Sequence, residues 1–259
     1  MAQETFNEQE KIRKYLKRIR YNGKPALNFN TLHALQHAHL ITVPYENLDI
    51  MRNIPISLEI KDIYEKIVNQ GRGGYCFELN GLFAWLLRSL GFNVIEHMAR
   101  FLRGETEVPM RRHRVMRVSF GHNEYLCDVG VGGVVPRKPI PLITSKVSEQ
   151  NGERYKLELD DFFGYVLYEW KHDNWRGLYS FTNEEQLNID YIMPSFYCEN
   201  HPSSQFRVQD MVHIFTTEGR KSVVGREFRI FSPDNVKIIT PTTNSAYKEL
   251  LYLHFGIVI

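Results

Sequence analysis

The spacing of the hydrophobic residues changes near Phe92, and this change limits the folds that are open to the chain. Before Phe92, apolar residues recur at helical intervals. After it, they alternate with a period of two, which is typical of half-buried strands. The helical segments are 8–20, 30–40, 58–68 and 77–90, and the strand segments are 94–102, 114–120, 124–129, 155–159, 165–171 and 175–181. Helices first and strands later predict an α+β fold rather than alternating βαβ units.

The last third of the chain carries a mixed pattern. We expect a helix at 184–192, strands at 212–217, 221–224 and 227–231, and a closing helix at 244–255. Within the first third, Asn30 is the expected N-cap of the second helix. The 121–123 segment, between two alternating runs, is the expected hairpin turn.

Composition removes several classes of function. The 259 residues carry 32 basic and 30 acidic side chains, so the net charge of +2 does not favour a dedicated nucleic-acid binder. Three cysteines form neither a disulfide framework nor a C-x-x-C zinc pair. The N-terminus is polar, and the apolar run that ends before Arg88 is much shorter than the ~20 residues of a membrane span. We therefore expect a cytoplasmic protein that uses neither nucleic acid nor membrane as a partner.

One segment, Arg72-Gly-Gly-Tyr-Cys-Phe-Glu-Leu-Asn80, joins a tight turn to the start of the strongest helix. Cys76 falls at that start. The positive end of a helix dipole lowers the pKa of a thiol and favours the nucleophilic thiolate. Backbone N–H groups at the same helix end can hold an oxyanion. The alternative is that Cys76 is a small buried apolar residue.

A cysteine nucleophile needs a base, and the base needs an acceptor that orients it. His113 opens one strand pattern and Asp128 ends the next, so a short hairpin would place both near one edge. Taken singly, His113 reads as a strand histidine at the surface and Asp128 as a turn-capping carboxylate. Together with Cys76, the two residues favour nucleophilic catalysis.

Histidines also occur at an i, i+4 spacing that suits a metal. His33 and His37 have this spacing, but the segment lacks the glutamate of an H-E-x-x-H motif. A half-exposed helix face explains them better, and we expect no metal site.

These motifs resemble those of the arylamine N-acetyltransferases. The Arg-Gly-Gly-x-Cys-Phe-Glu-x-Asn signature is complete at 72–80, and the sequence Asp-Val-Gly-x-Gly-Gly begins at Asp128. The segment 43–48, Val-Pro-Tyr-Glu-Asn-Leu, resembles the family's Val-Pro-Phe-Glu-Asn-Leu motif. The segment 201–206, His-Pro-Ser-Ser-Gln-Phe, resembles a motif that lines the coenzyme A and substrate cleft. The matches extend over residues 43–206.

The resemblance implies a three-part architecture. Its parts are a helical bundle at 1–91 that carries the nucleophile, a central antiparallel β-barrel-like domain at 92–183 that carries the histidine and aspartate, and an α/β lid at 184–259. It also implies xenobiotic metabolism and a ping-pong reaction with acetyl-CoA as donor. Acetyl would pass through the cysteine to the nitrogen, or the N-hydroxyl oxygen, of arylamines, hydrazines and hydroxylamines.

The resemblance also assigns roles to residues. The catalytic residues would be Cys76, His113 and Asp128, and Asn80 would support the aspartate. Contacts to the cofactor would come from Gly130, His201 and Ser203. The substrate pocket would be formed by Tyr45, Val131 and Phe206. Glu46 and Arg72 read as a structural ion pair rather than catalytic groups.

Two departures concern the pocket. Family members often carry phenylalanine where this chain has Val131, so the acceptor pocket should be wider and lack a stacking face. Tyr45 adds a hydroxyl where the family motif has phenylalanine. Two other functions stay open: a cysteine hydrolase or transglutaminase-like acyltransferase, and a catalytically silent binding protein on the same scaffold. We expect a monomer or a weak homodimer.

Overall fold

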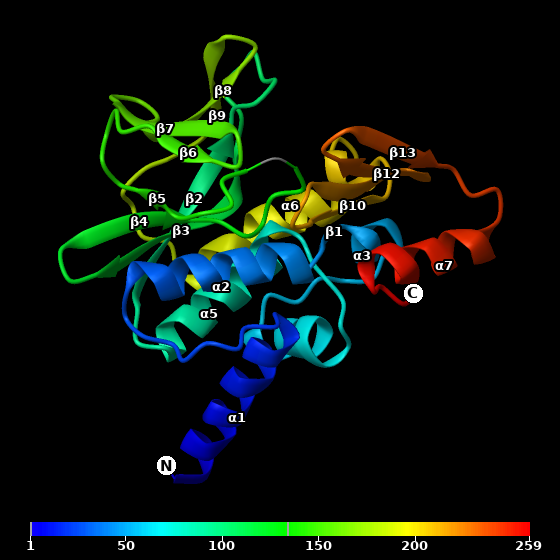
Figure 1. Cartoon of the computed structure of the whole chain (residues 1–259), viewed down its shortest axis with the longest axis horizontal. Coiled ribbons are helices and arrows are strands. Elements are labelled where there is room, and N and C mark those ends of the chain that lie inside the picture. The colour runs from blue at the N-terminus through cyan, green and yellow to red at the C-terminus, as the bar shows by residue number, and fades with distance from the viewer. Residues whose placement is uncertain (1, 134) are drawn as a thin grey trace.

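The computed structural model describes residues 2–133 and 135–259, and of residues 2–7 it describes the backbone only. Figure 1 shows helices below, a strongly curved sheet at the upper left and a smaller sheet with a helix at the right. The predicted α+β class is confirmed by this arrangement. The division of the chain into domains at residues 91 and 183 stays a prediction.

The first part of the chain is helical, as predicted, apart from one short strand. Its elements are α1 (Ala2–Arg18), α2 (Phe29–Thr42), β1 (Tyr45–Glu46), α3 (Leu48–Met51), α4 (Ile60–Tyr64), a π-helical turn (Glu65–Asn69) and α5 (Cys76–Ser89). The expected N-cap at Asn30 is wrong: Asn28 caps α2 by accepting a 2.9 Å hydrogen bond from the Thr31 N–H. Helix α5 is buried on nearly every side, because its apolar residues surround it rather than forming one stripe.

The curved sheet holds eight strands in the order β5-β4-β3-β2-β9-β8-β7-β6, and all neighbours are antiparallel. The strands are β2 (Asn93–Phe101), β3 (Arg111–Phe120), β4 (Asn123–Cys127), β5 (Ile140–Pro141), β6 (Ser148–Gln150), β7 (Glu153–Asp160), β8 (Gly164–Lys171) and β9 (Asn174–Phe181). A bridge between Thr144 and Leu157 draws the two ends of the sheet toward each other. The six strands predicted in this region are all present, and the β3–β4 hairpin turns at Gly121 and His122 as expected.

A second sheet has the order β1-β10-β11-β12-β13, and we call it the C-terminal sheet. Its later strands are β10 (Met211–Phe215), β11 (Arg220–Val224), β12 (Glu227–Ser232) and β13 (Asn235–Ile239). Helix α7 (Asn244–Phe255) packs on it through a separate apolar core, and its bounds match the predicted 244–255. Strand β13 escaped prediction because it is an edge strand that buries almost no side chain.

The predicted helix at 184–192 is wrong. A single 3₁₀ turn (Asn188–Tyr191) leads into α6, which spans Ile192–Asn200. Pro194 lies in the first turn of α6. The N–H groups of a first turn have no acceptor within the helix, so a proline there costs no intrahelical hydrogen bond. The proline therefore stands near the start of this helix instead of beyond its end.

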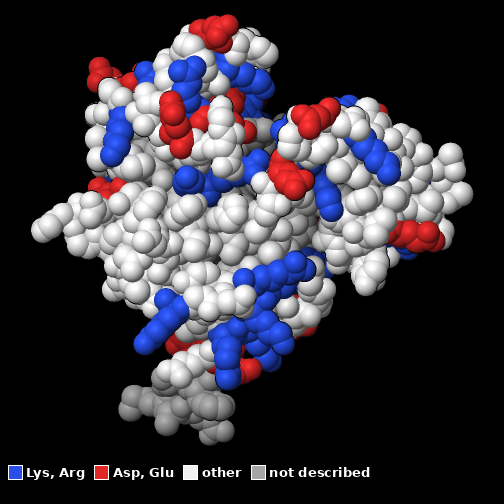
Figure 2. Space-filling view, in the orientation of Figure 1, with Lys and Arg blue, Asp and Glu red and all other residues white. Residues whose placement is uncertain are grey.

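Within the described part of the chain, no helix combines the length and the hydropathy that crossing a membrane requires. Figure 2 shows basic and acidic side chains side by side along the hollow between the curved sheet and the C-terminal sheet.

Candidate active site

Two glycines let the chain turn tightly just before α5. A Cβ atom on Gly73 would lie 2.0 Å from the carbonyl oxygen of Pro44, and one on Gly74 would lie 2.8 Å from a carboxylate oxygen of Glu78. Glycine is therefore the residue that fits at both positions. The close approach allows Tyr45 in β1 to bridge to Gly74, and it delivers Cys76 as the first residue of α5.

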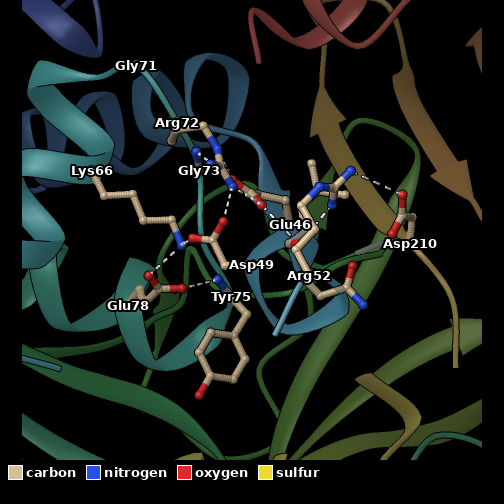
Figure 3. Close-up of polar contacts among 12 residues, drawn as sticks. Glu46, Asp49, Arg52, Lys66, Gly71, Arg72, Gly73, Tyr75, Glu78 and Asp210 are labelled. Atoms are coloured by element: carbon tan, nitrogen blue, oxygen red, sulfur yellow. Dashed lines mark hydrogen bonds and ion pairs between the residues drawn. The ribbon is translucent and has the colours of Figure 1, made fainter. Parts of the chain in front are cut away.

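The predicted pair of Arg72 and Glu46 forms one half of a buried ion network (Figure 3). The guanidinium of Arg72 donates at 2.9 Å and 3.0 Å to the two carboxylate oxygens of Glu46 and at 2.8 Å to Asp49. Glu46 also accepts the N–H of Gly73 at 3.2 Å. The network thus fixes the backbone of the glycine turn.

Lys66 forms the other half of this network. Its ammonium lies 2.7 Å from Asp49 and 2.8 Å from Glu78. Burial alone would lower the pKa of Lys66, but the surrounding carboxylates raise it, so the ammonium stays charged. The second oxygen of Glu78 accepts the N–H of Tyr75 at 3.1 Å, which caps the first turn of α5. Lys66 therefore holds the helix start that carries Cys76.

His113 and Asp128 meet as the sequence predicts. Nε2 of His113 lies 2.7 Å from Oδ2 of Asp128, and both side chains are buried. The other carboxylate oxygen of Asp128 accepts the side-chain amide of Asn80 and the N–H of Gly130, each at 2.8 Å. The carboxylate is therefore fixed from three directions. The ring of Tyr179, which sequence reasoning did not single out, packs against the imidazole of His113, with centroids 5.4 Å apart.

Asn80 connects helix α5 with the curved sheet. It stands one turn after Cys76 on α5, so the two side chains share a helix face. Its amide oxygen accepts the N–H of Val129 at 2.9 Å, beside the bond to Asp128. A Cβ on Gly130 would lie 2.8 Å from the Cα of Cys76, so this glycine allows the loop after β4 to approach Cys76.

These groups line a cavity of about 190 Å³. Its wall includes Cys76, His113, Gly130 and all three predicted pocket residues, Tyr45, Val131 and Phe206, and the further lining residues are Phe101, Arg103, Arg112, Gly132, Gly133, Gln205 and Met211. His201 and Ser203 lie elsewhere, at the exposed end of α6, where Nδ1 of His201 is 2.8 Å from Oγ of Ser203.

Burial raises the pKa of the Cys76 thiol, whereas the backbone N–H groups of Arg114 and Phe77 lower it. The expected effect of the helix N-terminus is therefore outweighed, and the prediction of a lowered thiol pKa is wrong for this pocket. The thiol donates to the carbonyl oxygen of Arg112, with Sγ 3.8 Å away. A buried thiol of this kind needs a neighbouring base before it becomes a nucleophile.

Arg112 lines the Cys76 cavity, although the regular alternation of a strand would place it on the opposite face from His113. Ala99 of β2 pairs with His113, but Arg100 pairs with Arg111, so Arg112 is the extra residue of a β-bulge. A bulge redirects side chains that regular alternation would send to opposite faces. Arg112 and His113 accordingly both line the cavity. Arg112 lies 3.5 Å from Glu105, whereas Arg103 pairs with Glu169 through two 2.8 Å bonds.

Across residues 2–133 and 135–259, no three His, Cys, Asp or Glu side chains are grouped so that they could hold a metal ion. The rings of His33 and His37 do lie near each other, with centroids 6.1 Å apart.

Comparison with known proteins identifies a family with which this chain shares sequence. A family model described as N-acetyltransferase matches residues 28–259. The arylamine N-acetyltransferase of Mycobacterium tuberculosis is 33% identical over 249 residues, covering 94% of this chain and 88% of that protein. The Escherichia coli arylamine N-acetyltransferase is 38% identical over 194 residues, covering 74% and 69%.

Solved structures agree with the sequence matches. The M. tuberculosis arylamine N-acetyltransferase superposes with a TM-score of 0.88 at 33% identity, covering 95% of this chain and 93% of that one. The Salmonella typhimurium enzyme gives 0.91 at 27% identity, covering 95% and 91%. The Mycobacterium marinum enzyme in complex with CoA gives 0.87 at 31% identity, covering 95% and 92%. The chain belongs to the arylamine N-acetyltransferase family.

Proposed function

We propose that this protein transfers the acetyl group of acetyl-CoA to an arylamine nitrogen by way of an acetyl group on Cys76. The observation that supports this most directly is that Cys76 and His113 line one cavity. The imidazole of His113 is held by Asp128 at 2.7 Å. The M. marinum relative that was solved with CoA supports the choice of donor.

We infer a separate task for each nitrogen of His113. Nε2–H donates to Asp128, so the lone pair of Nδ1 is left to take the proton of the Cys76 thiol. The sulfur then attacks the thioester carbonyl of acetyl-CoA, and the bond to the coenzyme sulfur breaks as the imidazolium returns the proton to it. Asp128 stabilises the imidazolium during this exchange. The acetyl group is left on Cys76 as a thioester.

In the second half of the reaction, the acetyl group passes from Cys76 to the acceptor. The nitrogen of an arylamine, hydrazine or hydroxylamine, or the oxygen of an N-hydroxyl group, attacks the acetyl carbon while Nδ1 of His113 takes its proton. The C–S bond breaks, and the thiol is restored with the same proton. We place the acceptor ring among Tyr45, Val131 and Phe206, which all line the cavity. Gly130, His201 and Ser203 remain our proposed contacts for the coenzyme.

The test is intact-mass spectrometry of the protein with acetyl-CoA in the absence of amine. We expect the wild type to gain the mass of one acetyl group, to lose it when an aryl hydrazine is added, and to release one coenzyme A. Cys76→Ser should gain nothing, because a hydroxyl is far less ionised than a thiol at neutral pH. Cys127→Ser is the matched control, since Cys127 is also buried but lies outside the cavity, and it should acetylate normally.

The two rival functions give different results. Steady release of coenzyme A without amine, with no discharge by the hydrazine, would indicate a hydrolase. An absent adduct, absent coenzyme A release and a Cys76 that resists iodoacetamide would indicate a silent binding protein. Acetylation that persists in Cys76→Ser would refute the proposed nucleophile.

A further inference from the structure

A second and larger cavity lies beside α6, and we call it the α6 pocket. It has a volume of about 560 Å³, roughly three times that of the cavity around Cys76. Its walls are the chain at 53–59 and one face of α6, and none of its lining residues lines the Cys76 cavity. Its volume falls within the ~300–1,000 Å³ that is typical of sites for small organic molecules.

Most of the wall is apolar. Ile54, Ile192 and Phe196 line the α6 pocket although about half or more of each side chain is exposed, at 49%, 50% and 62%. Ile56 and Leu58 continue the same wall from the loop. A ligand with a hydrocarbon body would remove this apolar surface from water, which favours binding.

A carboxylate is fixed in this apolar wall. One oxygen of Glu199 accepts the hydroxyl of Ser195 at 3.1 Å, and the other accepts the N–H of Ile56 at 3.1 Å. No Lys, Arg or His among the described residues forms an ion pair with this carboxylate. Arg207 lies close by, but it donates to the backbone carbonyl of Glu199 and to the side chain of Asn53. The negative charge is therefore rigid and lacks a direct counter-ion.

Hydrogen bonds also connect the α6 pocket to Tyr75, the residue before Cys76. The Ser195 hydroxyl that bonds to Glu199 lies 2.5 Å from the hydroxyl of Tyr75. The ring of Tyr75 meets Phe206 edge-on, with centroids 5.8 Å apart, and Phe206 lines the Cys76 cavity. A change at Glu199 can thus reach the nucleophile through two side chains.

We propose that the α6 pocket binds an organic cation with a hydrocarbon body, its charge set against Glu199, and that its occupation alters the reactivity of Cys76. The proposal does not depend on the acetyl-transfer function, because binding and thiol reactivity are measured without acetyl-CoA.

Two probes of matched shape test the charge preference. Benzyltrimethylammonium and benzylsulfonate share the benzyl body and a tetrahedral head group but differ in the sign of the charge, and neither has a nitrogen that can be acetylated. By titration calorimetry and ligand-observed NMR, we expect the cation to bind at least about tenfold more tightly than the anion. Equal affinity, or tighter binding of the anion, would overturn the proposal.

Two charge variants locate the cation. Glu199→Gln keeps the shape of the side chain. Its amide oxygen can accept the N–H of Ile56, and its amide nitrogen can donate to the hydroxyl oxygen of Ser195, which reverses the direction of that hydrogen bond. We expect this variant to bind the cation at least about tenfold more weakly. Arg207→Gln is the matched control and should not weaken binding. Weaker binding in Arg207→Gln but not in Glu199→Gln would show that the cation does not sit against Glu199. Loss of binding in Val131→Phe but not in Glu199→Gln would place the cation in the Cys76 cavity.

A steric variant and a coupling variant complete the test. Ile54→Trp should fill the α6 pocket and abolish binding, whereas Ile238→Trp, an equally exposed position on β13, should not. Circular dichroism confirms that each variant folds. With the cation bound, the iodoacetamide rate of Cys76 should change in the wild type and stay constant in Tyr75→Phe. Binding with no rate change in the wild type would refute the coupling.

Discussion

Nε2 of His113 lies 2.7 Å from Oδ2 of Asp128, and this contact orients the imidazole in the wall of the Cys76 cavity. An imidazole has two nitrogens, and engaging one with a carboxylate turns the other into the base. Because burial raises the pKa of the Cys76 thiol, the nucleophile that we propose depends on that base rather than on its own acidity.

Replacing His113 should therefore shift the ionisation of Cys76. In His113→Ala we expect the pH midpoint of iodoacetamide alkylation to rise above the ~8.5 of an ordinary cysteine, and the rate at pH 7 to fall at least about tenfold. His201→Ala, at an exposed position, should leave the profile of the wild type. An unchanged midpoint in His113→Ala would show that the histidine does not control this thiol.

The buried ion network makes Lys66 indispensable. Lys66→Met would leave Glu78 without an ion-pair partner among the described residues, whereas Asp49 keeps Arg72. An unpaired buried charge typically costs about 3–5 kcal/mol in the free energy of unfolding. Urea denaturation measures this loss, and Lys24→Met, at an exposed position, should cost almost nothing. A loss below about 1 kcal/mol would mean that the network adds little to stability.

Val131 controls the width of the proposed acceptor pocket. We expect Val131→Phe to narrow the 190 Å³ cavity. The ratio of kcat/KM for a small aryl hydrazine to that for a bicyclic arylamine should rise about tenfold, the scale on which a hydrophobic pocket discriminates by size. Val108→Phe, on the exposed surface, is the control. A constant ratio would place the acceptor ring away from residue 131.

Because two histidines are buried, we expect the free energy of unfolding to fall at acidic pH. Burial lowers the pKa of His39 and that of His213 to about 3. Between pH 6.5 and 3 the unfolded chain binds these protons and the folded chain does not, so the free energy of unfolding falls as the pH falls. Each histidine contributes about 1.4 kcal/mol per pH unit in this range.

His213→Leu tests this expectation. Going from pH 7 to pH 5, its unfolding free energy should drop by about 2 kcal/mol less than that of the wild type. His122→Leu, which removes an exposed histidine, should keep the full drop. Equal drops in all three proteins would mean that His213 accepts a proton in the folded state.

The parts of the site that were predicted from sequence are those set by local patterns. Helix α5 has a strong apolar pattern and a glycine turn before it, and the hairpin that carries His113 and Asp128 has two strand segments joined by a short turn. The resemblance joined these segments, and the structure brings the two side chains together.

The parts that escaped prediction depend on tertiary contacts. The bulge at Arg112 breaks the alternation that sequence reasoning relies on. Nothing in the sequence around Lys66 indicates that its ammonium pairs with Asp49 and Glu78. Tyr179 packs against His113 from strand β9, which begins more than fifty residues after the end of β3. Strand β1 is too short to show a period, and its partner β10 begins at Met211.

The pairing of β1 with β10 also has a consequence for the order of synthesis. Tyr45 and Glu46 leave the ribosome long before Met211, and at ~5–20 residues per second the delay is on the order of 10–30 s. During that interval one edge of β1 has no partner, although the same strand already adjoins Gly74 on its other edge. A nascent chain thus carries Cys76 well before β10, the strand that completes the neighbouring β1, has been made.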